Sequence, residues 1–254
     1  MAYAKINNIT NANMGKVNNA AKAAIGKISN VDAPAAGGCA AVALSANSYF
    51  IELDGVNDYI DTAADATAQD ATYSFWLKNE VSGTNKGIFG RANQGASTGS
   101  FGLSSDEPYL AYGGGWQVWW NEDDVMDDGN WHHWMLFVDI SAIGSSKLYI
   151  DGELMSQRTA RTYGSTGAYG HGITIGRSHN DYFEGSIDEF AIFTGDKTSC
   201  AETYYNSGTP TDLSSESNLI GYWRMEENTG TSVADGSSNS NAGTLTNGAA
   251  FNAY

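Results

Sequence analysis

The feature that most constrains the fold is a series of short segments rich in aromatic and β-branched residues, each bounded by Gly, Asp or Asn. Residues 71–79, ATYSFWLKN, place Tyr73, Phe75 and Leu77 on one face of a strand. Residues 131–140, WHHWMLFVDI, are apolar on both faces, which is typical of a central strand between two sheets. Short strands separated by regularly spaced turns predict an all-β, antiparallel two-sheet sandwich.

Turn and helix signals agree with this fold class. The composition, 30 Gly and only 3 Pro beside 14 Tyr and 7 Trp, suits strands joined by tight turns. KLYIDGELMS predicts a hairpin whose two-residue turn is Asp151 and Gly152. One short helix is expected in TSCAETYYNSGTP, with Thr198 or Ser199 as its N-cap. Residues 219–227, LIGYWRMEE, predict a further strand in which Trp223 is buried.

The N-terminal region is repetitive and differs in composition from the rest of the chain. Residues 5–37 form three lines of eleven residues, KINNITNANMG, KVNNAAKAAIG and KISNVDAPAAG. Recurrent Gly and Asn favour short strands and turns over a continuous helix. We expect an arm with its linker at residues 1–44, and one domain at 45–254 that is completed by its C-terminal segment 213–254.

One arm buries too little apolar surface to offset its ordering entropy. We therefore expect it to attach to other proteins or to associate with identical arms, with a trimer favoured; a floppy tail is the alternative. Each line opens with a lysine and an aliphatic residue, and these pairs are the predicted attachment residues: Lys5, Ile6, Lys16, Val17, Lys27 and Ile28.

The charge is unevenly distributed. The net charge is −16, but residues 45–254 hold 9 basic and 28 acidic residues, a net charge of −19. Such a body repels nucleic acid and anionic lipid. No segment approaches the run of about 20 apolar residues that a membrane span needs, so no membrane insertion is expected. For the two cysteines, Cys39 and Cys200, unpaired thiols are favoured over a disulfide.

Four motifs occur in an order that resembles a known family. LDGVNDYI, NWHHWMLFVD, LYIDGEL and GSIDEFAIF follow one another between residues 53 and 193. They resemble laminin-G-like jelly rolls of the concanavalin A-like lectin/glucanase superfamily, over about residues 50–207. Residues 219–248 resemble the segment that usually opens such a domain. The resemblance therefore implies a permuted strand pair that completes the sandwich, within this chain or on a neighbour.

The arm resembles the Lys-Ile/Val-Asn repeats at the start of virion proteins of marine bacteriophages. This resemblance implies a non-enzymatic virion structural protein, made in the host cytoplasm, that serves as a capsid decoration or fibre-like subunit among other virion proteins. In this hypothesis the arm attaches the protein, and the outward jelly roll binds a cell-surface glycan. A free carbohydrate-binding lectin module is the alternative, and a glycoside hydrolase is a third.

The hydrolase hypothesis depends on acidic residues. Glucanases of this superfamily carry an ExDxxE strand, and retaining hydrolysis needs two carboxyl groups about 5 Å apart. The nearest segment is EGSIDE, whose acids are Glu184, Asp188 and Glu189. Residues 188 and 189 are neighbours, so on a regular strand they would point to opposite faces. The motif is therefore missing, and we expect no enzyme.

Calcium is the metal to consider, because carboxylates in loops suit a hard cation. In related jelly rolls the motifs that here contain Asp54, Asp58 and Asp188 lie near a structural Ca²⁺; the alternative is that these aspartates only build turns and accept backbone hydrogen bonds. The adjacent His132 and His133 make a poor metal pair, since strand neighbours point in opposite directions. They are expected to be hydrogen-bonded structural residues.

The glycan hypothesis depends on GGGWQVWWNEDD. On a strand, Trp116, Val118 and Trp120 would share the core face. The other face combines a flat aromatic ring with amides and a carboxylate, which together suit a sugar. The predicted glycan residues are Trp119, Gln117, Asn121 and Asp123. The alternative is that Trp119 packs under a loop.

Overall fold

The computed structural model divides the chain into two units, Met1–Gly38 and Cys39–Tyr254. It describes residues 38–40, 42–44, 46–66, 69–83, 85–91, 98–112, 115–121, 127–160, 172–178 and 180–254. The eleven-residue repeats and their six predicted attachment residues lie outside this described part. The predicted boundary between residues 44 and 45 stays a prediction. Among the described residues, no helix has both the length and the apolarity to cross a membrane.

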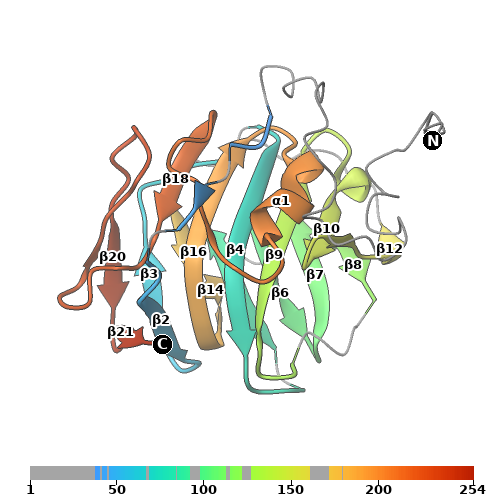
Figure 1. Cartoon of the computed structure of the whole chain (residues 1–254). Coiled ribbons are helices and arrows are strands. Elements are labelled where there is room, and N and C mark those ends of the chain that lie inside the picture. Colours follow the sequence, from blue (N-terminus) through green and yellow to red (C-terminus); the bar gives the residue numbers. More distant parts are fainter. Residues whose placement is uncertain are drawn as a thin grey trace, which may run out of the picture. The chain divides into compact units, whose positions relative to one another are not determined.

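Two large antiparallel sheets make up the second unit (Figure 1). The first, called the eight-stranded sheet, runs in the order β11-β10-β9-β4-β16-β2-β21, and β18 also pairs with β16. Its strands are β2 (Tyr49–Asp54), β4 (Ala71–Asn79), β9 (Trp131–Val138), β10 (Lys147–Ile150), β11 (Glu153–Leu154), β16 (Glu184–Thr194), β18 (Leu219–Trp223) and β21 (Ala250–Ala253). Asp151 and Gly152 both have positive φ between β10 and β11, so the predicted hairpin is confirmed.

The second sheet, called the nine-stranded sheet, runs in the order β12-β8-β7-β6-β5-β13-β3-β20-β19. Its strands are β3 (Tyr59–Asp61), β5 (Lys86–Arg91), β6 (Thr98–Ser104), β7 (Glu107–Tyr112), β8 (Gly115–Trp120), β12 (Gln157–Ala160), β13 (Ile173–Ile175), β19 (Ser232–Val233) and β20 (Gly243–Thr246). Two further strand pairs are β1 (Val42–Ala43) with β17 (Thr211–Asp212), and β14 (Arg177–Ser178) with β15 (Asp181–Tyr182).

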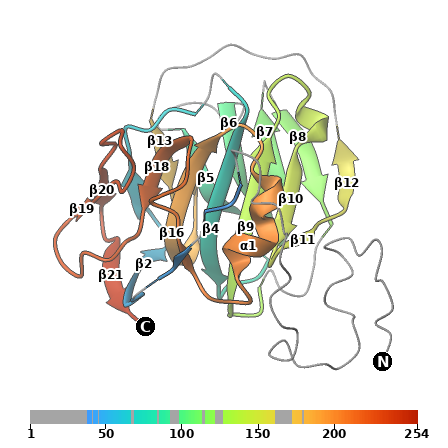
Figure 2. The same ribbon diagram turned by 45° about the horizontal axis from the view of Figure 1, so that its top comes forward.

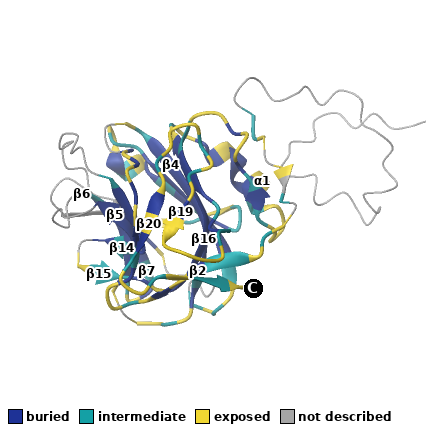
Figure 3. Ribbon diagram, turned by 90° about the vertical axis from the view of Figure 1, so that its left-hand side faces the viewer, coloured by how far each residue is buried: buried dark blue, intermediate teal, exposed yellow. Residues whose placement is uncertain are grey.

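An aromatic core fills the space between the two large sheets. Phe75 stacks on Phe190 with ring centroids 5.1 Å apart, and Trp120, Trp134 and Trp223 are each at most 1% exposed. Figure 3 shows buried residues along β4, β5 and β16. The predicted antiparallel sandwich is confirmed.

A second cluster covers the outer face of the eight-stranded sheet. Short helices η5 (Thr198–Cys200) and α1 (Ala201–Tyr205) lie on that face (Figure 2), and Tyr204 packs there with Met135 and Phe193. The 131–140 segment is therefore apolar on both faces because a helix covers its outer side, and not because it lies between two sheets. One more short helix, η4 (Ile143–Ser145), precedes β10.

The helix start differs from the prediction. Cys200 is the N-cap of α1 and forms no side-chain cap, whereas Thr198 lies inside η5. The Thr198 hydroxyl instead donates to Asp196 Oδ1 over 2.6 Å. The same oxygen of Asp196 accepts from the Thr198 amide over 2.8 Å, so this acid satisfies the first amide of η5.

The C-terminal strands pair with this chain's own sheets. β18 pairs with β16, β21 with β2, and β20 with β3. Trp223 is fully buried, as predicted, and its indole N–H donates to the carbonyl of Asn241 over 2.9 Å. The segment therefore contributes both strands and core to the sandwich.

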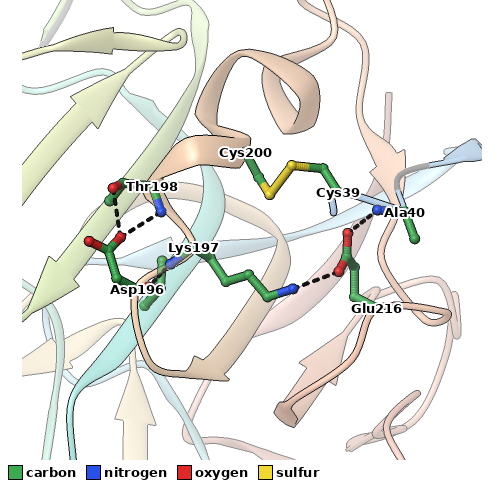
Figure 4. Close-up of a disulfide and its surroundings, with 8 residues drawn as sticks. Cys39, Ala40, Asp196, Lys197, Thr198, Cys200 and Glu216 are labelled. Carbon is green, nitrogen blue, oxygen red and sulfur yellow. Dashed lines mark hydrogen bonds and ion pairs between the residues drawn. A yellow bond between two sulfur atoms is a disulfide. The ribbon is translucent and has the colours of Figure 1, made fainter. Parts of the chain in front are cut away.

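Cys39 and Cys200 form a disulfide, so the prediction of two unpaired thiols is wrong (Figure 4). Their Cα atoms are 5.5 Å apart despite a sequence separation of 161 residues. Folding brings them together because Glu216 accepts a hydrogen bond from the Ala40 amide, while Lys197 Nζ holds Glu216 Oε2 at 2.9 Å. Residues 39 and 40, expected in the linker, are thus fixed to the domain.

Candidate functional site: an aromatic hollow on the eight-stranded sheet

The predicted glycan surface lies on β8 of the nine-stranded sheet. Val118 and Trp120 are buried in the core, while Trp119 faces the other side and is half-buried. The ring of Trp119 lies 5.5 Å from that of Tyr109, its partner on β7. The guanidinium of Arg158 lies over the Trp119 ring at 5.6 Å. This cation, which the sequence analysis did not include, shares the platform.

The other predicted members of this surface are only partly described. Asn121 is exposed, and its amide donates to the Ser156 hydroxyl over 2.9 Å. Asp123 and the side chain of Gln117 lie outside the described part of the structure. The predicted combination of Trp119 with all three polar groups therefore stays a prediction.

A second aromatic surface lies on the outer face of the eight-stranded sheet. A hollow of about 230 Å³ is present there, which we call the aromatic hollow. Trp76 comes from β4, and Trp131 begins β9. The remaining lining comes from segments that flank other elements: Asn47 before β2, Gly208 and Pro210 after α1, and Tyr254 after β21.

The rings of the hollow support one another. Trp131 and Tyr254 have centroids 5.5 Å apart, and Phe50 contacts both, at 5.4 and 5.1 Å. Trp76 is only 4% exposed, whereas Tyr254 is 56% exposed. The hollow thus combines a buried indole at one wall with an exposed aromatic wall that is already ordered.

A buried carboxylate holds two sides of the hollow in place. Asp188 Oδ2 accepts from the Tyr254 hydroxyl at 2.7 Å and from the Asn47 amide at 2.8 Å. Asp188 is fully buried, and this burial raises its pKa to about 7 although both hydrogen bonds favour the charged form. The amide oxygen of Asn47 has no hydrogen-bond partner within the described residues. This oxygen is itself buried, so it is not open to a ligand hydroxyl.

The prediction that Asp188 and Glu189 point to opposite faces of the strand is wrong. The β16–β4 register shifts between Asp188 and Ala191, and Glu189 has φ +49°. Ile187 and Phe190 enter the core, so Asp188 and Glu189 between them both lie outside the core cluster and not on opposite faces. A bulge, which no residue type in EGSIDE announces, causes the difference.

Glu189 has its own partners. Its carboxylate accepts from the Tyr222 hydroxyl and from Arg224 Nε, the latter over 3.2 Å. Burial, and then the charge of Asp188, raise its pKa to about 8. Glu184, the third acid of EGSIDE, is exposed and lies opposite Asp54 on β2. The three acids therefore do not converge on one open site.

The two histidines are hydrogen-bonded, as predicted. His132 Nδ1 lies 2.6 Å from Asp151 Oδ2, and its Nε2 lies 3.1 Å from Asp128 Oδ1. The hydrogen bond with Asp151 is the main cause of the raised pKa of His132. His133 is buried and its Nε2 lies 2.8 Å from the Ser74 hydroxyl. Its pKa is lowered to about 4 because burial disfavours the charged ring.

The three aspartates predicted to bind calcium are not gathered together. Asp54 and Asp58 share one turn, where Asp58 Oδ2 accepts from the Asp54 amide over 3.3 Å and Asp58 Oδ1 accepts from the Gly248 amide over 2.6 Å. Asp188 lies four residues along β16 from the position opposite Asp54, or about 13 Å. The described residues contain no cluster of three or more His, Cys, Asp or Glu side chains suited to a metal. These three residues do not fit a single calcium site as they stand.

The fold and the sequence agree on the class of protein. The two-sheet sandwich is that of a lectin-like jelly roll, and the Laminin_G_3 profile of the concanavalin A-like lectin/glucanases superfamily matches residues 54–200. The chain therefore belongs to this superfamily. No curated protein is similar to it in sequence.

Solved structures share the fold at low identity. A Bacteroides ovatus protein, provisionally named a carbohydrate-binding protein, is 16% identical with a TM-score of 0.59; the match covers 81% of this chain and 60% of that one. A pentraxin from Limulus polyphemus is 13% identical with a TM-score of 0.48, covering 64% of this chain and 84% of that one. At these identities the likeness concerns the fold alone.

The hollow has no local signature in the sequence. Its members come from five separate segments, and no local pattern joins Asn47 or Tyr254 to Trp131. One residue at the hollow, Asp188 of the GSIDEF motif, is singled out by the sequence, but as a predicted calcium ligand. In the structure this acid instead orders the walls of the hollow.

Proposed function

We propose that the jelly roll binds a neutral glycan in the aromatic hollow. The observation that carries this proposal is the ordered Trp131–Tyr254 ring pair, which lines the hollow. Aromatic rings stack on the apolar face of a sugar. The provisional name of the Bacteroides ovatus neighbour supports the same class of ligand.

The charge of the domain favours neutral over acidic sugars. The net charge of −19 over residues 45–254 gives a field that repels anions. Among the described residues, those that line the hollow include no cation. An acidic sugar would therefore be repelled by the domain and would form no ion pair in the hollow.

The test compares two tryptophans. Retention of the protein on a panel of neutral polysaccharides should be lost in Trp131→Ala and kept in Trp119→Ala, with folding of both variants checked by circular dichroism. The reverse result would move the glycan site to the predicted β8 surface. Retention that neither substitution alters would refute both sites.

We also propose that the protein is a non-enzymatic virion structural subunit, anchored by its N-terminal arm. The eleven-residue repeats support attachment, because a segment with so little apolar surface needs a partner to become ordered. The Cys39–Cys200 disulfide supports a final location outside the reducing cytosol, such as a virion surface. Other virion proteins, or identical arms in a trimer, would be the partners.

Three assays separate this proposal from its alternatives. Sedimentation of the protein with intact particles from a lysate supports the virion subunit. Polysaccharide binding by a protein that never sediments with particles supports a free lectin module. Release of reducing sugar, abolished by Glu189→Gln, would establish a glycoside hydrolase and refute the non-enzymatic proposal.

A further inference from the structure

A buried lysine lies against an amide at one end of the sandwich. Lys86 begins β5 and is only 1% exposed, which is uncommon for lysine. Its Nζ lies 2.9 Å from Oδ1 of Asn79, the last residue of β4, and 3.4 Å from Oδ1 of Asp106, in the turn between β6 and β7. Asn79 and Asp106 are also buried, at 4% and 5% exposure.

We propose that Lys86 Nζ and Asn79 Cγ become joined by an intramolecular isopeptide bond, with Asp106 as the proton-transfer group. This inference is independent of glycan binding, because the three residues do not line the aromatic hollow. It assigns a covalent modification to a cluster that would otherwise be a buried ion pair beside an amide.

The reaction needs no oxidant and no cofactor. Asp106 takes a proton from the Lys86 ammonium, and the freed lone pair attacks Asn79 Cγ, which lies one C=O bond, about 1.2 Å, from the oxygen that Nζ already contacts. The Cγ–Nδ2 bond then breaks. Asp106 gives its proton to the departing nitrogen and takes the second proton of the attacking nitrogen, so that the Lys86 ammonium, the Asn79 carboxamide and the Asp106 carboxylate have become a secondary amide, ammonia and a protonated Asp106.

The surroundings favour the neutral amine that must attack. Burial lowers the pKa of Lys86, although the charge of Asp106 opposes this. The Gly83 amide holds the other carboxylate oxygen of Asp106 at 2.5 Å, and positive φ values at Ser105 and Asp106 fix the turn. Nucleophile, carbonyl and proton acceptor are thus held together, which removes most of the entropic cost of their encounter.

The bond would tie the two large sheets to each other. β4 belongs to the eight-stranded sheet and β5 to the nine-stranded sheet. The disulfide, in contrast, ties Cys39 to the outer cluster. An amide link is insensitive to reductants, so it would complement the disulfide in a protein that functions outside a cell.

Mass spectrometry of the full-length protein tests the proposal. The intact mass should be lower than the sequence mass by about 17 Da, the mass of ammonia, after correction for the disulfide. Trypsin should fail to cleave after Lys86, so that residues 79–91 are recovered as one peptide with the same deficit. A succinimide at Asn79 would give the same deficit but leave Lys86 cleavable, and that outcome would overturn the proposal. An unmodified mass would overturn it as well.

Two matched variants test the role of the acid. Asp106→Asn should restore the full mass and the cleavage after Lys86, while Glu107→Gln, at the adjacent acid, should keep the deficit. A deficit that persists in Asp106→Asn would overturn the role of Asp106. If Asp106→Asn does not fold, Lys86→Arg provides the unlinked reference, since arginine keeps the charge but cannot form the bond.

Discussion

The two aromatic surfaces of this domain are built in different ways. Trp119 stands on one strand, and its neighbours Tyr109 and Arg158 come from the two strands that pair with β8. The hollow around Trp131 instead gathers segments that are up to about two hundred residues apart, including Asn47 and Tyr254. An aromatic ring whose polar neighbours lie on the same strand is visible in the sequence, whereas a surface gathered from distant segments is not.

The two surfaces also differ in what orders them. At Trp119 an exposed ion pair between Arg158 and Glu107 borders the ring, and exposed pairs stabilise a fold by only about 0–1 kcal/mol. At the hollow, the buried Asp188 carboxylate holds Tyr254 and Asn47. Loss of a partner there leaves a buried polar group unpaired, which costs more. The hollow is therefore the more firmly preorganised of the two.

The largest effect should come from removing the C-terminal strands. A chain that ends after Asp212 lacks β18, β20 and β21, with Trp223 and the Tyr254 wall of the hollow. Loss of the buried Trp223 side chain alone costs about 3–5 kcal/mol, so we expect the domain to unfold and both surfaces to be lost. Circular dichroism and thermal melting measure this.

Deletion of residues 1–37 is the matched control. It should leave a folded, monomeric domain by circular dichroism and light scattering. If the C-terminal truncation melts at the parent temperature, or the N-terminal deletion unfolds, the assignment of the core to residues 39–254 is wrong.

Next in size is the contrast between adjacent tryptophans on β8. Trp120→Ala should destabilise the domain by about 3–5 kcal/mol, because Trp120 is fully buried. Trp119→Ala should cost clearly less, about 1 kcal/mol, because its ring is only half-buried and lies outside the core. Urea unfolding at equilibrium measures both. Equal losses would show that Trp119 is a core residue and would remove the β8 surface as a glycan site.

Cys39→Ser tests the covalent link on the outer cluster. Loss of a disulfide typically costs about 2–4 kcal/mol, and we expect a lower melting temperature with one thiol newly titratable at Cys200 after unfolding. The unfolded, unreduced parent should show no titratable thiol. Two thiols in the parent would restore the original prediction of unpaired cysteines.

A smaller effect should appear in the pH dependence of stability. The pKa values of Asp188 and Glu189 rise from 3.8 and 4.5 to about 7 and about 8 because both groups are buried. Between the unfolded-state and the folded-state pKa values, the folded state binds more protons than the unfolded state. The two acids therefore contribute to the free energy of unfolding at low pH, and this contribution is lost as pH rises through about 7 to 8.

Asp188→Asn removes one of these groups, and its melting temperature should fall less steeply with pH than that of the parent. Groups such as His132, which titrate in both proteins, cancel in the comparison. If the melting temperatures of the parent and the variant change with pH in the same way, the pKa of Asp188 is not raised by burial.

The smallest expected effect concerns calcium, which stays a prediction for Asp54, Asp58 and Asp188. If a bound ion links these residues, a chelator should lower the melting temperature of the parent and leave Asp188→Ala unaffected. If the chelator has no effect on the parent, calcium is excluded as a structural ion and Asp188 acts only through Asn47 and Tyr254.

The sequence alone determined the sandwich, the β10–β11 turn and the inward direction of Trp120 and Trp223. These features follow from period-two alternation and from turn residues, which are local properties of the backbone. The family motifs added the jelly-roll class and the permuted C-terminal strand pair. Alternation along EGSIDE gave the wrong faces for Asp188 and Glu189, because a bulge breaks the period.

Only the tertiary structure decided which distant groups meet. The Cys39–Cys200 disulfide, the aromatic hollow and the Lys86–Asn79–Asp106 cluster all depend on contacts between segments that no sequence period connects. Side-chain burial, and with it the raised pKa of Asp188 and the lowered pKa of Lys86, is set by what packs against a residue. Burial and these pKa shifts are properties of the folded chain, because the groups lose their contact with water only when both sheets and the outer cluster have formed.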